Sequence, residues 1–175
     1  MMTLCHHFLE TPLGRMIIAA STHGVCLLEF VDLPRFDKEI FALQRLLKAQ
    51  MVPGKNAHTR QAAQELTEYF RGVRQVFTVA LHPPGTAFQQ RVWAALCTLP
   101  YGTTTHYQAL AAHIGKPTAV RAVAAANGAN RVSILIPCHR VIGKNGALIG
   151  YGGGLSRKAW LLAHERGMTP SELSV

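Results

Sequence analysis

The sequence lacks any long apolar segment and has few cysteines. In its 175 residues, no apolar run approaches the ~18 needed to cross a bilayer, and the N-terminus resembles no signal peptide. The four cysteines are far apart, without Cys-x-x-Cys spacing, so neither a disulfide framework nor a compact zinc site is indicated. These absences argue against membrane and disulfide-rich secreted proteins. We expect a soluble cytoplasmic protein, associated with the nucleoid or, in a eukaryote, nuclear.

Acidic residues are scarce in the second half of the chain. Residues 1–84 carry nine Lys and Arg against seven Asp and Glu, whereas residues 85–167 carry nine against one, Glu165. A basic module most often binds a polyanion such as nucleic acid, although a merely solvated basic surface has the same composition. Because Glu165 stands alone among nine cations, we expect it to have a specific role.

A break at residues 82–85, His-Pro-Pro-Gly, indicates a domain boundary. It predicts an N-terminal scaffold domain at 1–84, a second domain at 85–167 and a tail at 168–175. The fold class predicted is α/β (α+β), with a small antiparallel sheet and helices in the first domain. The second domain reads as mostly helical.

The first domain shows no chemistry. Its apolar patterns predict strands at 15–20, 25–31 and 76–81, and two helices capped by Asp37 and Thr59. The inward-facing residues predicted are Ile40, Phe41 and Leu47 in the first helix, and Ala62, Leu66, Tyr69 and Phe70 in the second.

The second domain opens with a capping box at residues 86–89, Thr-Ala-Phe-Gln. A helix begins at Tyr107 and ends at Gly115, and another covers residues 118–127 with Pro117 in its first turn. Two helices joined by a tight turn that contains glycine resemble a helix-turn-helix.

The helix predicted at 118–127 has an unusual outer face. Helical spacing predicts Val120, Val123, Ala124 and Asn127 on the buried face, and Thr118, Arg121, Ala122, Ala125 and part of Ala126 on the opposite face. Solvated faces are normally charged, whereas a smooth face with one long Arg suits close approach to another surface. We favour a DNA-contacting face, and a helix buried all round with Arg121 reaching solvent is the alternative.

Cys138 is the candidate nucleophile. An apolar, strand-like run at 132–136 precedes it, His139 follows it, and a glycine-rich loop at 143–154 comes next. A nearby His can generate the reactive thiolate, and a carboxylate such as Glu165 can orient that His. An inert buried cysteine is the alternative. A final helix, predicted from a Ser156 cap to Arg166 with Gly167 as its stop, carries Glu165.

These segments resemble the O-6-alkylguanine-DNA alkyltransferases (methylated-DNA–protein-cysteine methyltransferases). The resemblance covers residues 85–167 in order, and only loosely reaches the first domain. Its blocks are TAFQQRVW at 86–93, YQALA at 107–111, RAV at 121–123, PCHRVIG at 137–143, YGGG at 151–154 and KAWLLAHE at 158–165, with TPLG at 11–14 in the first domain.

The resemblance implies a role for each site residue. Cys138 is the alkyl acceptor, His139 its base through a water, and Glu165 the residue that orients His139. Asn130 braces the turn before the active site, and Tyr107 helps rotate the nucleotide and donates toward guanine N3. The implied DNA contacts are Arg121, Thr118, Ala122, Ala125 and Tyr107, and the implied pocket residues are Val141, Tyr151 and Gly152 together with the carbonyl of Cys138.

The function implied is direct repair of double-stranded DNA with an alkylated guanine. The base is flipped through the minor groove, and the alkyl group moves from O-6 to Cys138 as a thioether, once per molecule. Activity on O-4 of thymine stays open. No cofactor and no membrane partner are implied, and we expect a monomer, with cooperative assembly on DNA left open.

Several positions depart from the family pattern. Gly152 replaces a serine of some members, Ala124 and Ala125 replace glycines, and Ser133 replaces a proline. Some relatives carry a structural zinc in the first domain, but the spacing of Cys5, His6, Cys26 and His82 gives no support for one.

Three other functions compete with repair. A non-catalytic protein that recognises alkylated DNA would not need Cys138. A cysteine hydrolase or redox enzyme would not need the basic, alanine-faced helix. A plain DNA-binding regulator would leave Cys138, His139 and Glu165 without a role.

Overall fold

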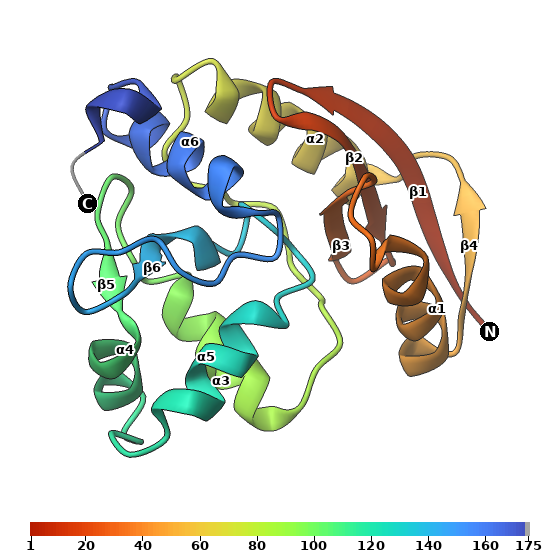
Figure 1. Ribbon diagram of the computed structural model, residues 1–175. Helices are drawn as coiled ribbons and strands as arrows, with labels where there is room; N and C mark the ends of the chain where they lie inside the picture. The colour runs from red at the N-terminus through yellow and green to blue at the C-terminus, as the bar shows by residue number, and fades with distance from the viewer. Residues whose placement is uncertain (174–175) are drawn as a thin grey trace. The chain divides into compact units, whose positions relative to one another are not determined.

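The computed structural model describes residues 1–173, and the chain divides into two compact units (Figure 1). The first unit is Met1–Pro84 and the second begins at Gly85. The mixed fold class expected from the sequence is confirmed: the first unit holds a sheet with helices, and the second is largely helical. Within residues 1–173, no helix has both the length and the apolar character to cross a membrane.

A four-stranded sheet forms the first unit. Its strands are β1 (Met2–Thr11), β2 (Gly14–Ala20), β3 (Val25–Phe30) and β4 (Ala49–Pro53), in the order β3-β2-β1-β4. The β1–β2 and β2–β3 pairs are antiparallel, whereas β4 runs parallel to β1. The sheet is therefore mixed rather than purely antiparallel.

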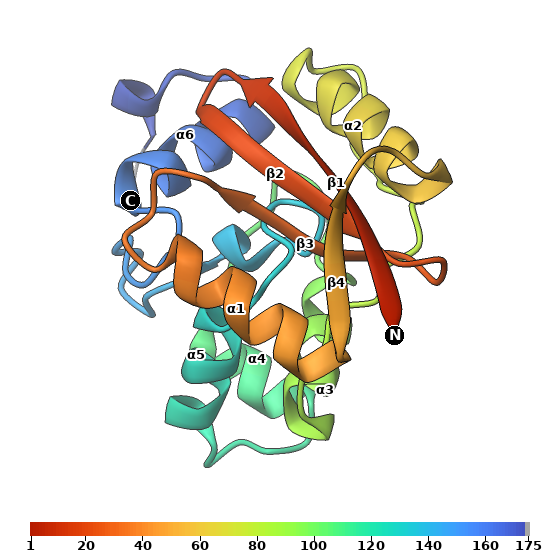
Figure 2. The ribbon, with the colours of Figure 1, turned by 90° about the vertical axis from the view of Figure 1, so that its right-hand side faces the viewer.

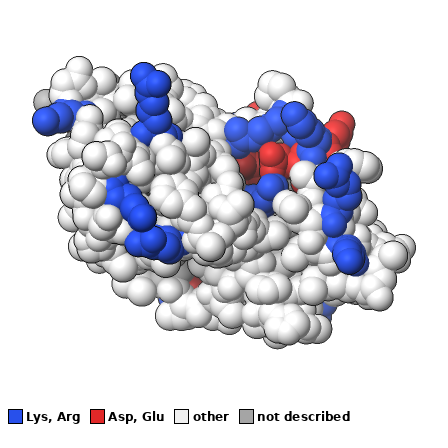
Figure 3. All heavy atoms as spheres, turned by 90° about the horizontal axis from the view of Figure 1, so that it is seen from below, with Lys and Arg blue, Asp and Glu red and all other residues white. Residues whose placement is uncertain are grey.

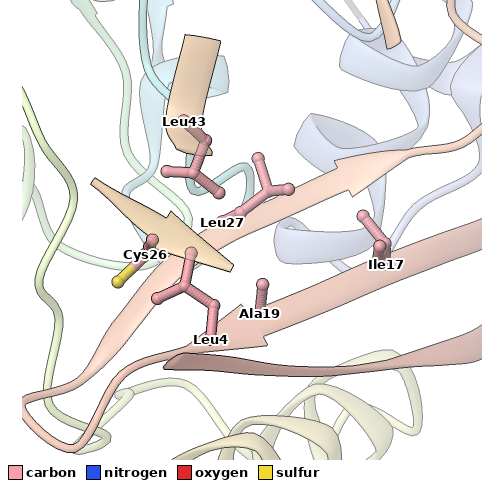
Figure 4. Packing of buried hydrophobic residues seen from close by; sticks show 7 residues of the cluster. Leu4, Ile17, Ala19, Cys26, Leu27 and Leu43 are labelled. Carbon is pink, nitrogen blue, oxygen red and sulfur yellow. The ribbon is translucent and has the colours of Figure 1, made fainter. Parts of the chain in front are cut away.

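Two helices, α1 (Phe36–Leu47) and α2 (Ala57–Phe70), pack on the sheet, on opposite faces (Figure 2). Leu43 of α1 joins one buried cluster with residues of all four strands (Figure 4). The members of this cluster are Leu4, Ile17, Ala19, Cys26, Leu27, Leu43 and Ala49. Alternation along β2 sends its other residues to the opposite face, so the sheet has a core on both sides.

Several local predictions for the first unit are wrong. Strands β1 and β4 were not predicted from the sequence. Residues 76–81 form no strand, because only an isolated bridge joins Leu81 to Val25. Asp37 lies inside the first turn of α1 rather than at its cap, and Phe41 is 65% exposed.

The N-cap of α2 lies three residues before the predicted one. Asn56, not Thr59, is the N-cap; Thr59 is the third residue of the helix and completes a reciprocal capping box with Asn56. The inward face predicted for α2 is otherwise largely correct, since Ala62, Leu66 and Tyr69 are buried.

The second unit begins with α3 (Ala87–Leu96), whose predicted capping box between Thr86 and Gln89 is confirmed. A short strand, β5 (Thr105–His106), leads into α4 (Tyr107–His113). After a turn, α5 (Val120–Gly128) completes the expected helix-turn-helix.

The rest of the second unit carries the Pro-Cys-His-Arg segment. A short 3-10 helix, η1 (Cys138–Arg140), is followed by β6 (Val141–Ile142), which pairs in parallel with β5. The last helices are α6 (Leu155–Glu165) and η2 (Pro170–Glu172).

Three expectations for the middle of this unit need correction. Residues 132–136 form a tight turn rather than a strand; Ile134 has a φ of 72° and the segment is buried by packing, which explains its apolar character. Pro117 and Thr118 lie in the turn before α5 rather than in its first turn. Ala126, expected partly on the outer face, is 3% exposed.

The start of α6 differs from the expectation, whereas its stop does not. Gly154 is the N-cap of α6, so Ser156 lies inside the helix. The predicted stop at Gly167 is confirmed by its φ of 67°. Within the described residues, the segment read as a tail packs back on α6, because Met168 N donates to Ala163 O and η2 follows. Its last two residues, 174 and 175, lie outside the described residues.

Candidate active site

Cys138 is the first residue of η1 and is 5% exposed. Its backbone N–H donates to Ile136 O at 2.8 Å, which fixes the chain at the end of the 132–136 turn. The side-chain amide of Asn130 donates to Cys138 Sγ at 3.1 Å. A hydrogen bond donated to sulfur favours the thiolate, the form that reacts.

Asn130 connects α5 to this turn. Its Nδ2 also donates to Ile136 O at 2.9 Å, and its Oδ1 accepts from Val132 N at 3.0 Å. One turn earlier, Asn127 Nδ2 donates to Cys138 O at 3.5 Å. The C-terminal end of the second helix of the helix-turn-helix and the residues just after it therefore hold the candidate nucleophile, Cys138, in place.

His139 and Glu165 lie side by side although 26 residues separate them. His139 is 0% exposed, and its Nε2 is 2.7 Å from Glu165 Oε1. A neutral imidazole that donates from Nε2 presents its lone pair at Nδ1. This Nδ1 is buried and has no hydrogen-bond partner within residues 1–173. It is thus the nitrogen left to accept a proton.

The environment sets the charges of this pair. Burial lowers the pKa of the His139 imidazole, and the opposing effect of Glu165 is smaller. Burial by itself would raise the pKa of the Glu165 carboxyl, but hydrogen bonds and charge from His139 and Arg140 hold that pKa well below its usual range. The site therefore holds an ionised Glu165 next to a neutral His139.

Lys158 of α6 is 0% exposed, a rare environment for an ammonium group. Its Nζ donates to Val141 O and to Ile149 O, the latter at 2.7 Å, and more weakly to Gly150 O at 3.4 Å. Burial lowers the pKa of Lys158 from 10.5 to about 8. The cation fastens the glycine-rich loop to β6 within electrostatic range of Cys138.

Tyr107, the first residue of α4, reaches the same loop. Its hydroxyl donates to Ile149 O at 3.3 Å and to Gly150 O at 3.5 Å. Burial and the neighbouring Cys138 raise the pKa of Tyr107, so its hydroxyl stays protonated. Tyr107 and Lys158 together hold the 149–150 segment from two helices.

The remaining candidate residues lie in two places. Val141 is buried, while Tyr151 and Gly152 are partly buried in the glycine-rich loop. Thr118, Arg121, Ala122 and Ala125 are exposed on and just before α5, outside the buried cluster around Cys138. The face of the second unit seen in Figure 3 shows Lys and Arg with hardly any Asp or Glu.

Comparisons with known proteins decide the family. Residues 4–83 match the 6-O-methylguanine DNA methyltransferase ribonuclease-like domain, and residues 87–167 match the DNA binding domain of the same methyltransferase. A methylated-DNA–protein-cysteine methyltransferase of Methanosarcina barkeri is 41% identical over 160 residues, which are 91% of this chain and 96% of that protein. The chain belongs to this methyltransferase family.

Other relatives agree over nearly the full length. The Mycobacterium leprae methyltransferase of the same name is 39% identical over 167 residues, 95% of each chain. The crystal structure of Mycobacterium tuberculosis OGT in complex with DNA has a TM-score of 0.81 and 38% identity, covering 95% of this chain and 96% of that one.

Arg140 and Lys158 lie in this candidate site, but no role was predicted for either from the sequence. They stand within the segments PCHRVIG at 137–143 and KAWLLAHE at 158–165. A helical signal for Lys158 was present, because it shares the spacing i, i+3, i+4 and i+7 with Leu161, Leu162 and Glu165. Nothing local in the sequence marks Arg140 as the partner of Glu165.

The first unit of this family member does not fit a structural zinc. Cys26 Sγ and His82 Nδ1 lie 4.0 Å apart. Within residues 1–173, however, no group of three or more His, Cys, Asp or Glu side chains is placed to hold a metal ion.

Proposed function

We propose that this chain removes an alkyl group from O-6 of guanine in double-stranded DNA and keeps it on Cys138. The observation that carries the proposal is the buried Cys138 thiol, which accepts a hydrogen bond from Asn130 and adjoins a His139–Glu165 pair. The membership of the chain in the methyltransferase family supports the same chemistry. As an enzyme it is a methylated-DNA–protein-cysteine methyltransferase that uses one protein molecule for each lesion.

The reaction is a displacement at the alkyl carbon. The bond from Cys138 Sγ to carbon forms as the bond from carbon to O-6 breaks, and the electron pair stays with the guanine. The thiol proton passes through a water to Nδ1 of His139, whose other nitrogen Glu165 holds. Tyr107 donates a proton to guanine N3 and is reprotonated from water, and His139 returns the thiol proton to water. Overall the thiol hydrogen moves to the guanine and the alkyl group takes its place on sulfur.

The guanine reaches Cys138 outside the base stack. Because Cys138 is buried, a base paired within the duplex cannot approach it, and flipping costs a few kcal/mol. Arg121 extends from an otherwise alanine-rich exposed face of α5 and can fill the space that the base leaves. Ala122 and Ala125 allow α5 to approach the minor groove closely, and Thr118 adds a phosphate contact.

The pocket reads the flipped base mainly through the backbone. The carbonyls of Cys138 and Val141 accept from the guanine amino group, and Tyr151 and the Gly152 N–H lie near O-6. Val141 O already accepts from Lys158 Nζ. A carbonyl oxygen has two lone pairs, so it can accept from both donors.

The product is a thioether, which water does not cleave as it would a thioester. Each molecule therefore reacts once. We propose that the protein acts as a monomer, because all reacting groups come from the second unit of one chain. Within a cell we place it with the DNA.

The test is the intact mass of the protein after mixing with excess duplex DNA that contains one 6-O-methylguanine. We expect one added methyl group per chain, located at Cys138 by peptide mapping. The Cys138→Ser variant should bind the same DNA, with an affinity that falls as salt rises, and gain no mass. If the unmodified protein bound the lesion without any mass gain, it would be a damage-recognition protein.

A further inference from the structure

All three guanidinium nitrogens of Arg140 donate hydrogen bonds within the protein. The side chain is buried, and Nε donates to Glu165 Oε2 and NH2 to Glu165 Oε1, both at 2.9 Å. The third nitrogen, NH1, donates to Leu99 O at 2.7 Å. The guanidinium carbon also lies 5.8 Å from the centre of the Tyr101 ring. Arg140 is thus fixed by contacts outside Glu165 as well as by the two bonds to it.

The Glu165 carboxylate is saturated as a result. Oε1 accepts from His139 Nε2 and Arg140, and Oε2 accepts from Arg140 and from Gly102 N at 3.3 Å. A bidentate guanidinium–carboxylate pair fixes the plane of the carboxylate as well as its position. Glu165 therefore cannot rotate away from His139, and its orientation is set by Arg140.

The ion pair between Arg140 and Glu165 also affects the proton affinity of His139. The charged groups that act on His139 are Glu165 and Lys158 of α6 and the adjacent Arg140 of η1, and Cys138 precedes it in the chain. Glu165 favours a protonated imidazole, whereas Arg140 and Lys158 oppose it. Without Arg140, Glu165 would hold a proton on His139 up to a higher pH, so less of the imidazole would be in the neutral form that can accept the thiol proton.

We propose that Arg140 is a positioning residue that acts through Glu165: it aligns the carboxylate with His139 while keeping the imidazole uncharged and ready to accept the thiol proton. This inference rests on the proposed function, in which His139 is the base for Cys138. It assigns to Arg140 an effect on the proton affinity of His139 that a purely structural ion pair would not have.

The test compares Arg140→Met and Arg140→Lys with Arg166→Met as the matched control. Arg166 is exposed at the C-terminal end of α6, next to Glu165. Within residues 1–173, the one hydrogen bond of its side chain goes to Thr104 Oγ1 at 3.5 Å. Two readouts are needed: the single-turnover rate of methyl transfer between pH 5 and 9, and the titration of the His139 ring by NMR in the unreactive Cys138→Ser background.

For Arg140→Met we expect the His139 midpoint to rise by about one pH unit, a roughly tenfold increase in proton affinity. The acid limb of the rate profile should move to higher pH by the same amount, with unchanged DNA affinity. Arg140→Lys keeps the charge but loses the bidentate geometry, so its midpoint should rise by less. Arg166→Met should match the unmodified protein in both readouts.

A slower rate with an unchanged midpoint in both Arg140 variants would overturn the inference and make Arg140 purely structural. If Arg140→Met does not fold, Arg140→Lys decides by the same criterion. Failure of the proposed function is distinguishable: the unmodified protein would then gain no methyl group, whereas the His139 titration would still report on Arg140.

Discussion

Methylation of Cys138 should destabilise the protein. Cys138 is 5% exposed, so the added methyl group must fit into packed surroundings, and overfilling a core typically costs about 1–3 kcal/mol. The methylated sulfur is also a poorer acceptor for Asn130 Nδ2, now 3.1 Å away, and losing such a bond costs about 0.5–1.5 kcal/mol. Together these effects lower the free energy of unfolding by about 1.5–4.5 kcal/mol.

The expected change is measurable by calorimetry. For a chain of this size, 1 kcal/mol corresponds to about 2–4 °C in Tm, so the methylated protein should melt about 3–18 °C lower. Protein methylated to one group per chain, as verified by mass, is compared with free protein after removal of the DNA. The Cys138→Ala variant, taken through the same treatment, should show no change in Tm.

An Asn130→Ala background separates the two contributions. Because the hydrogen bond to sulfur is already absent there, methylation should lower its stability by about 1 kcal/mol less than in the unmodified sequence. Equal melting temperatures for the free and methylated proteins would refute the reasoning, since they would show that the surroundings of Cys138 accept a methyl group without strain.

Three further outcomes are expected from the second unit. Arg121→Ala should slow methyl transfer at least about tenfold, because Arg121 offsets the cost of flipping the base. Its affinity for undamaged duplex should change by only a few-fold. Equal losses in both assays would show that Arg121 only contacts a phosphate. Ala125→Glu should weaken binding to every duplex sequence alike through charge repulsion and bulk at the groove, as measured by fluorescence anisotropy, and unchanged affinity would remove α5 from the interface. Lys158→Met should loosen the loop and slow transfer about tenfold or more, since Ile149 O and its neighbours lose their donor. The pKa of Lys158 is lowered to about 8 in the folded state, so the unfolded chain binds more protons between pH 8 and 10.5, and stability should rise with pH there; Lys158→Met should lack this rise in chemical denaturation.

Some features of this protein follow from local sequence. The capping box at Thr86 and Gln89 joins residues three positions apart, and the exposed Arg121, Ala122 and Ala125 follow from helical periodicity. Cys138 and His139 were recognisable from a contiguous motif. The capping box and the exposed helix face were predicted correctly because the interactions that decide them lie within one or two turns of the chain.

Other features depend on contacts between distant segments. Strand β1 was missed because its mixture of polar and apolar residues is stabilised by pairing with β2 and β4, rather than by a pattern of its own. The apolar run at 132–136 resembles a strand, but packing buries it as a turn around Asn130. Burial alone explains its composition, and composition cannot distinguish the two conformations.

The site shows the same division. The sequence by itself determined which groups can react, since a thiol, an imidazole and one isolated carboxylate stand out chemically. Only the tertiary structure decided how they are tuned: it places Glu165 between His139 and Arg140, and it buries the ammonium of Lys158 among carbonyls. Charge and proton affinity depend on distance and desolvation, and these quantities exist only once α6 has folded against η1.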